Sequence, residues 1–396
     1  MIAQRGGTAR LAAALLLCAA GLAAGAAGAA SAGPEKALSG VLEAIEDNRL
    51  DLATQRVEAL IAAHPNFRLA HLIRGDLLMA RARPLETFGN VPKTVPREKV
   101  EDLRAEALSR LRALRDRPDG DRVPRQLLQL APDQKHALVV DSRRSRLYVF
   151  ENVGGRPQFV ADYYVTLGKN GIEKTREGDQ KTPIGVYHVT GNLPRQKLTD
   201  FYGAGAFPIN YPNAWDRRMG RNGHGIWLHG TPSDTYSRPP RASDGCIVLA
   251  NADLEAVARN LQIGLTPVVI SDEIEWTDAA SLDAERRGLA GAFEAWRSDW
   301  ESRNTDRYLS HYAARFSSGD QNLAQWSAHK RKVNSAKSWI KIAISRVSML
   351  QYPREKFVEV SFDQDYRSNS LSNVMRKRQY WFREGGRWRI LYEGGA

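Results

Sequence analysis

The sequence predicts a multidomain protein with an N-terminal α-helical segment, a central mostly-β domain and a C-terminal α+β domain. Three observations support this prediction. The 396 residues exceed what one compact core usually holds. Apolar residues recur at helical spacing from about residue 35 to 130, and the pattern changes to that of strands over residues 134–272. After residue 282 a helix is followed by alternating strands, which is typical of an α+β domain.

Residues 1–32 have the order of a secretory signal peptide. Arg5 and Arg10 precede an apolar run, and Ala30-Ser31-Ala32 is a small-x-small cleavage site. The Ala/Gly-rich end of the run is too weakly apolar for a retained transmembrane anchor. We expect Cys18 to be removed with this segment, so the exported protein has one cysteine and no transmembrane segment.

Residues 33–130 form the predicted helical region. Apolar residues recur at three- and four-residue steps, Asp47-Asn48-Arg49 ends a first helix, and Pro65 ends a second. The spacing loosely resembles one and a half tetratricopeptide units. Because about three repeats are usually needed for a stable array, we expect a small cap or docking element.

Residues 134–272 form the predicted β domain. Strands over residues 137–140 and 146–150 flank a polar turn and suggest a hairpin. A further strand is expected between Phe159 and Gly168, and another begins at Thr182. Near the end of the domain, Asn251 is expected to cap a short helix before a closing strand over residues 267–270.

Residues 282–396 form a separate predicted unit. One helix is indicated by the spacing of Leu289, Phe293, Trp296 and Trp300, and alternating strands follow it. This unit has 21 Lys and Arg against 13 Asp and Glu, so it holds +8 of the +10 that remains once the signal peptide is removed. It contains no nucleophile–base pair, and we expect a binding or positioning role for it.

The formal net charge of +12 is compatible with an anionic partner. No nucleic-acid motif is present, so an exported protein of this charge would meet anionic envelope polymers or membrane surfaces. A solvated basic face is an equally good explanation. No metal or other cofactor is expected, because His224 and His229 lie five residues apart in an extended segment and would point to opposite faces.

Cys246 and His229 are the candidate nucleophile and base. Cys246 lies 17 residues after His229, which ends a predicted buried strand. A lone cysteine is usually a small buried hydrophobe. Here Ser243, Asp244 and Gly245 form a turn in front of the thiol, and such a turn can present the sulfur beside free backbone N–H groups.

These motifs together resemble the L,D-transpeptidase catalytic domain of bacterial peptidoglycan enzymes. The resemblance rests on His229-Gly230-Thr231, on Ser243-x-Gly245-Cys246-Ile247 and on a preceding Thr182-Pro183-x-Gly185 strand. The C-terminal unit resembles the cone-like nuclear-transport-factor-2 fold. Together the two resemblances imply a periplasmic wall enzyme of a Gram-negative bacterium that acts on peptidoglycan stem peptides.

The resemblance also implies roles for single residues. Cys246 would attack the diaminopimelate carbonyl of a stem tetrapeptide and release D-alanine, with His229 as its base and the backbone N–H groups of Gly245 and Cys246 facing the oxyanion. Candidate substrate-binding residues are Gly230, Thr231 and Arg241. Two positions depart from the family pattern, since Asp244 replaces a histidine and Val248 an arginine. Arg241 is a candidate partner for Asp244, which would otherwise raise the pKa of the thiol.

Three functions remain open from the sequence. The first is an L,D-transpeptidase, the second a carboxypeptidase or amidase that hydrolyses diaminopimelate-linked bonds, and the third a non-catalytic wall-binding scaffold. An intact Cys246/His229 pair argues against the third. Envelope proteins are possible partners through the helical or C-terminal unit, and a homodimer is possible.

Overall fold

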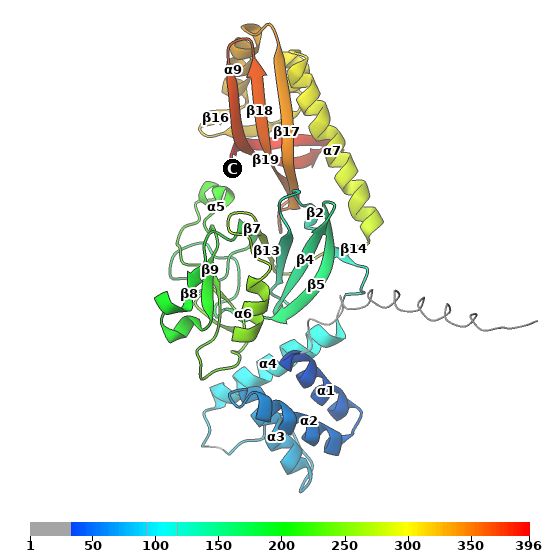
Figure 1. The fold of residues 1–396 in the computed structure, drawn as a ribbon, viewed down its shortest axis with the longest axis vertical. Helices are drawn as coiled ribbons and strands as arrows, with labels where there is room; N and C mark the ends of the chain where they lie inside the picture. The colour runs from blue at the N-terminus through cyan, green and yellow to red at the C-terminus, as the bar shows by residue number, and fades with distance from the viewer. Residues whose placement is uncertain (1–32, 93, 117) are drawn as a thin grey trace, which may run out of the picture.

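The computed structural model describes residues 33–92, 94–116 and 118–396. The molecule is elongated, with helices at one end, a β-rich domain in the middle and a curved sheet with three helices at the other end (Figure 1). The predicted fold class is confirmed. The predicted signal peptide lies outside the described residues. Within those residues, no helix is both long and apolar enough to cross a membrane.

The N-terminal region is helical, as predicted. Its apolar positions, among them Leu38, Val57 and Ile73, are buried between the helices. The breaks also lie where the sequence indicated, after residue 46 and after residue 63. The helices are α1 (Pro34–Glu46), α2 (Leu50–Ala63), α3 (Arg68–Ala80) and α4 (Arg97–Arg115).

The helical pattern ends at Arg115, so the expectation of helix as far as residue 130 is wrong for its last part. Residues 123–129 form two short strands, β1 (Val123–Pro124) and β2 (Leu127–Gln129). β1 pairs with β14 (Trp276–Thr277) and β2 with β17 of the C-terminal sheet. Leu127 and Leu128 are buried by these partners, which only the tertiary fold supplies.

A five-stranded sheet in the order β5-β4-β3-β13-β7 forms one layer of the central domain. The predicted hairpin is confirmed as β3 paired with β4 in antiparallel register, Val139 facing Tyr148. The closing strand β13 lies between β3 and β7. The bounds are β3 (His136–Asp141), β4 (Arg146–Val153), β5 (Arg156–Tyr164), β7 (Gly185–His188) and β13 (Pro267–Ser271).

A four-stranded sheet in the order β12-β10-β9-β8 and a two-stranded sheet of β11 and β6 complete the central domain. Leu228 and Ile247 from the four-stranded sheet share one buried core with Val268 of the first layer and Leu254 of the helix α6. The bounds are β6 (Leu167–Gly168), β8 (Leu193–Pro194), η1 (Arg195–Lys197), η2 (Asp200–Tyr202), β9 (Gly205–Pro208), α5 (Ala214–Arg218), β10 (Trp227–His229), β11 (Arg241–Ser243), β12 (Ile247–Val248) and α6 (Asn251–Ala258).

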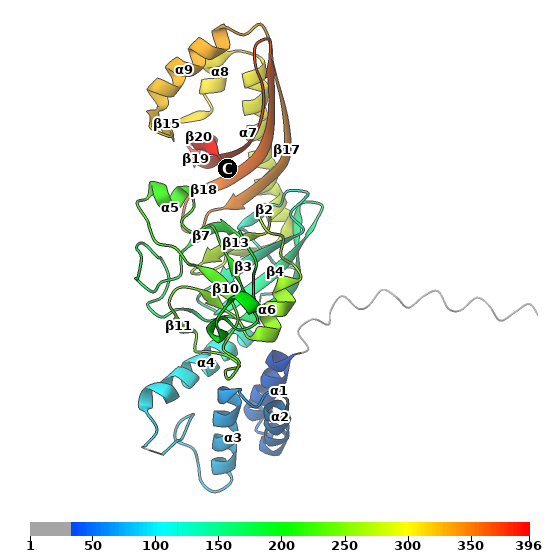
Figure 2. The same ribbon diagram turned by 60° about the vertical axis from the view of Figure 1, so that its left-hand side comes forward.

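The C-terminal domain is a curved sheet in the order β16-β15-β20-β19-β18-β17-β2. Figure 2 shows the sheet bending, with α8 and α9 on its concave side and α7 running along it. The predicted helix is α7, whose Leu289, Phe293, Trp296 and Trp300 are buried. The bounds are α7 (Ala279–Glu301), α8 (Thr305–Leu309), β15 (Tyr312–Ser318), β16 (Gln321–Asn322), α9 (Leu323–Ser335), β17 (Ile340–Gln351), β18 (Phe357–Ser368), β19 (Ser372–Glu384) and β20 (Arg387–Gly395).

The C-terminal domain and the central domain share a hydrophobic core. Trp215 of α5 packs against Phe357 and Tyr380, with ring centroids 4.6 and 5.4 Å apart. Gly185 lies so close to the Tyr352 hydroxyl that an added Cβ would approach it to 2.6 Å. The C-terminal unit is therefore packed against the central domain through a common set of buried side chains.

Candidate active site

Two parallel strands bring Cys246 and His229 to one face of a sheet. β10 ends on His229, β12 begins directly after Cys246, and Leu228 and His229 pair with Ile247 and Val248. Side chains alternate between the two faces of a strand. Because Leu228 and Ile247 enter the core, Cys246 and His229 both project from the opposite face, as diagonal neighbours. The strand register therefore places the two side chains on one face of the sheet.

The backbone sets the protonation state of His229. Its Nδ1 lies 2.7 Å from the carbonyl oxygen of Gly230, which can only accept a hydrogen bond. Nδ1 therefore carries the proton and Nε2 has a free lone pair. Burial lowers the pKa of His229 to about 4, and the charge of Arg238 adds to this effect. His229 is thus a neutral base at pH 7, ready to accept a proton at Nε2.

Cys246 is a protonated thiol in the resting protein. The side chain is half-buried, and its Sγ lies 3.3 Å from the carbonyl oxygen of Gly225. Burial raises the pKa of the thiol to about 11. The backbone N–H of Trp227 lowers it, the charge of Asp244 raises it further, and the charges of Arg238 and Lys174 lower it by less. Attack by this thiol on a carbonyl therefore requires transfer of its proton to a base.

Ser243 closes the turn that presents the thiol. Its hydroxyl donates to the carbonyl oxygen of Cys246 at 2.6 Å and accepts from the N–H of Gly245 at 3.2 Å. The Gly245 N–H is therefore engaged inside the turn, which corrects its expected role as an oxyanion donor. Among the described residues no acceptor faces the N–H of Cys246, so this group remains as the backbone donor.

Thr182, in the segment before β7, holds the same Ser243–Cys246 turn in place. Its buried hydroxyl accepts from the N–H of Gly168 at 2.9 Å and donates to the carbonyl oxygen of Gly245 at 3.0 Å. Gly245 has φ +122°, and a Cβ there would lie 2.7 Å from the carbonyl oxygen of Lys181. The sequence pointed to Thr182 through its motif, but its role in holding the cysteine turn needed the structure.

Asp244 is paired, although with a different partner from the one expected. The exposed carboxylate lies 2.9 Å from Lys169 Nζ and accepts from Gln180 Nε2 at 3.2 Å. Arg241 is exposed and has no ion pair in the described part of the chain. The expected Arg241–Asp244 pair is therefore wrong. β11 pairs with β6, and Lys169 directly follows β6, so this lysine lies close to Asp244.

Gly230 and Thr231 hold the loop that follows His229 in place and were expected to bind substrate. Thr231 is buried, its hydroxyl donates to the carbonyl oxygen of Tyr236 at 3.3 Å, and its own carbonyl oxygen accepts from Asn251 Nδ2 at 2.9 Å. An added Cβ on Gly230 would approach Asn251 Oδ1 to 2.1 Å. Asn251 is the first residue of α6 and binds these loops, so its predicted capping role is also corrected.

Sequence reasoning missed the aromatic surroundings of the histidine. Phe201 and Tyr202 lie with ring centroids 5.8 and 5.1 Å from that of His229, and Tyr202 contacts Trp227 at 5.0 Å. Arg238 lies over the Phe201 ring, 4.7 Å from its centroid. Phe201 and Tyr202 belong to the short 3-10 helix η2, and no periodic pattern surrounds it, so the sequence carried no signal for their position.

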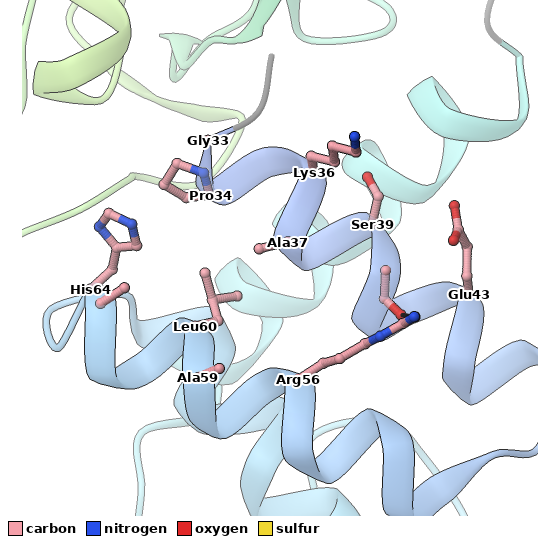
Figure 3. Close-up of a pocket in the computed structure, with 12 residues that line it drawn as sticks. Gly33, Pro34, Lys36, Ala37, Ser39, Glu43, Arg56, Ala59, Leu60 and His64 are labelled. Atoms are coloured by element: carbon pink, nitrogen blue, oxygen red, sulfur yellow. Dashed lines mark hydrogen bonds between the residues drawn. The ribbon is translucent and has the colours of Figure 1, made fainter. Parts of the chain in front are cut away.

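A hollow lies between α1 and α2, and none of the candidate site residues lines it. Figure 3 shows Arg56 reaching across it, where the guanidinium donates to the carbonyl oxygen of Gly40 at 2.6 Å. His64 lines one end, and no thiol lies there. Within the described residues no group of three His, Cys, Asp or Glu side chains could hold a metal ion.

Comparison with protein families supports the two resemblances. Residues 135–270 match the L,D-transpeptidase catalytic domain family (YkuD). Residues 288–394 match the Cds6 C-terminal NTF2-like domain. No curated protein matches the chain.

Two solved structures are similar over most of the chain. Bd1075 of Bdellovibrio bacteriovorus is 30% identical with a TM-score of 0.61, and the alignment covers 70% of this chain and 98% of Bd1075. Pgp2 of Campylobacter jejuni, described as a helical cell shape determining protein, is 26% identical with a TM-score of 0.58. That alignment covers 68% of this chain and 95% of Pgp2.

Proposed function

We propose that this chain, which belongs to the same family as Bd1075 and joins an L,D-transpeptidase catalytic domain to a C-terminal NTF2-like domain, is a cysteine acyltransferase of peptidoglycan stem peptides. One observation carries the proposal. Cys246 and His229 project from the same sheet face, and the Gly230 carbonyl holds His229 in the tautomer that accepts a proton at Nε2.

In the first half of the proposed reaction, Cys246 attacks the diaminopimelate carbonyl of a stem tetrapeptide. The thiol proton passes to His229 Nε2 while sulfur bonds to the carbonyl carbon, and the N–H of Cys246 faces the oxyanion. The C–N bond to D-alanine then breaks, and His229 returns the proton to the departing amine. A thioester on Cys246 and free D-alanine result.

In the second half an acceptor releases the acyl group from Cys246. An amine of another stem peptide gives a cross-link, which is the L,D-transpeptidase reaction that the sequence favoured. Water gives a tripeptide, which is the carboxypeptidase reaction. The pairing of Asp244 with Lys169 supports water as a second candidate acceptor, because the lysine offsets the attraction of the carboxylate for an incoming ammonium group.

We place the reaction in the periplasm, on the strength of the signal-peptide pattern in residues 1–32. A part in cell shape is proposed from the similarity to Pgp2. The C-terminal domain, with its excess of +8, is proposed to hold the protein on the sacculus.

Mass spectrometry of muropeptides tests the proposal. Purified protein without residues 1–32 is incubated with sacculus digests rich in tetrapeptides, and Cys246→Ala is the matched control. Tripeptides with free D-alanine support hydrolysis, and cross-linked dimers support transpeptidation. Unchanged tetrapeptides with both proteins would refute catalysis and favour the scaffold alternative.

A further inference from the structure

Arg238 is an unpaired cation beside the nucleophile. It is half-buried in the segment between His229 and Cys246, and its guanidinium lies over the Phe201 ring, 4.7 Å from the centroid. No hydrogen bond or ion pair of this guanidinium occurs within the described residues, and burial lowers its pKa from the ordinary value. The Phe201 ring lies 5.8 Å from the ring of His229, so Arg238 is separated from the candidate base by one aromatic ring. Its charge also lowers the pKa of both Cys246 and His229.

Two lysines near the thiol are already engaged. Lys169 pairs with Asp244 at 2.9 Å, and Lys174 pairs with Asp179 at 2.7 Å. Arg238 differs from both, because its guanidinium donors are free to meet an anion. A guanidinium presents five donors in a planar fork that matches a carboxylate.

The protein fixes the backbone of Arg238 from two sides. Its carbonyl oxygen accepts from the hydroxyls of Tyr164 and Thr166, each at 3.0 Å. The preceding residue, Ser237, donates to Glu106 Oε1 of α4 at 2.7 Å. The central sheet and the helical region thus hold the residue, while the Phe201 ring supports the plane of the guanidinium.

We propose that Arg238 binds the terminal carboxylate of the D-alanine that leaves during acylation. This inference rests on the proposed function. In a tetrapeptide the carboxylate is separated from the scissile carbonyl by one amide nitrogen and one Cα, so its receptor must lie close to Cys246. Arg238 is then a specificity determinant that selects donors ending in a free carboxylate.

The test compares two donors that differ only at this group. One is the stem tetrapeptide, and the other is the same tetrapeptide with a C-terminal carboxamide. Release of D-alanine or D-alaninamide by the protein without residues 1–32 is followed by mass spectrometry. Because both donors use the same thiol and base, the ratio of their rates removes any effect of the substitution on Cys246 itself.

The wild-type protein is expected to prefer the carboxylate donor by about 10- to 100-fold, as for one charge-assisted pair of hydrogen bonds. Arg238→Gln should bring this ratio to about one, chiefly by slowing the carboxylate donor, and Arg238→Lys should keep part of it. Arg259→Gln, which removes an exposed cation at the C-cap of α6, should keep the wild-type ratio. Far-UV circular dichroism and the unfolding temperature check that each variant is folded.

Two results would overturn the inference alone. One is a preference that survives in Arg238→Gln, and its loss in Arg241→Gln would then assign the role to Arg241. The other is a wild-type protein that cleaves both donors at equal rates. If the wild-type protein cleaves neither donor, the proposed function fails and the inference fails with it.

Discussion

Thr182→Val tests whether the cysteine turn is positioned from outside itself. The substitution keeps the shape of the side chain and removes one buried hydroxyl. That hydroxyl serves both the Gly168 N–H at 2.9 Å and the Gly245 carbonyl at 3.0 Å. Each buried group left without a partner costs about 1–3 kcal/mol, so the free energy of unfolding should fall by about 2–5 kcal/mol. A turn that is no longer fixed should also slow acylation by about 10- to 100-fold.

The assay measures stability and acylation separately. Urea unfolding gives the loss of stability, and intact-mass spectrometry follows the adduct that a carbapenem forms on Cys246 under conditions where the variant stays folded. Thr54→Val in α2 is the matched control, since its buried hydroxyl donates only to Leu50 within the helix at 2.8 Å. It should lose about 1 kcal/mol and acylate normally. If Thr182→Val lost stability but acylated Cys246 at the wild-type rate, the positioning argument would be wrong.

Further predictions concern the nucleophile, the base and the charges around them. Cys246→Ala should abolish the carbapenem adduct, and an adduct that persists on this variant would refute the assignment. Because the pKa of the thiol is about 11, alkylation of Cys246 by neutral iodoacetamide should rise about tenfold per pH unit from pH 7 to 10, and a plateau near pH 8.5 would contradict this. The pKa of His229 is about 4 in the fold and near 6.5 when unfolded, so the unfolded chain binds the proton first. The contribution of His229 to the free energy of unfolding is complete above about pH 6.5 and is about 2 kcal/mol smaller at pH 5. Urea unfolding should therefore show that the loss of stability between pH 7 and pH 5 is about 2 kcal/mol larger for the wild-type protein than for His229→Gln. Asp244→Asn should change carbapenem acylation less than about twofold, because the carboxylate is exposed and paired with Lys169; abolished acylation would place it in the thiol-activating machinery. Sedimentation of Cys246→Ala protein with sacculi should weaken as salt rises from about 50 to 300 mM if the basic C-terminal domain is the anchor, and salt-independent sedimentation would argue against a charge-based contact.

Local patterns predicted the elements of this protein well where one face of an element is apolar. The helices α1 and α2, the hairpin of β3 and β4, and α7 each carry a periodicity that burial requires, so their positions follow from the chain alone. The strands β1 and β2 were missed because they carry no periodicity of their own. They are only two and three residues long, and Leu127 is buried by partners from distant segments.

The site shows the same division. The residues alone predicted the candidate nucleophile and base, because a thiol after a Ser-Asp-Gly turn and a histidine at a strand end are local features. Only the tertiary structure decided what surrounds them. The ion pair of Asp244 with Lys169, the bond from Thr182 to the Gly245 carbonyl and the place of Arg238 over Phe201 join segments 37 to 75 residues apart. Such contacts depend on strand register and loop packing, which no local pattern encodes, so the protonation states and the carboxylate receptor emerge only in the folded chain.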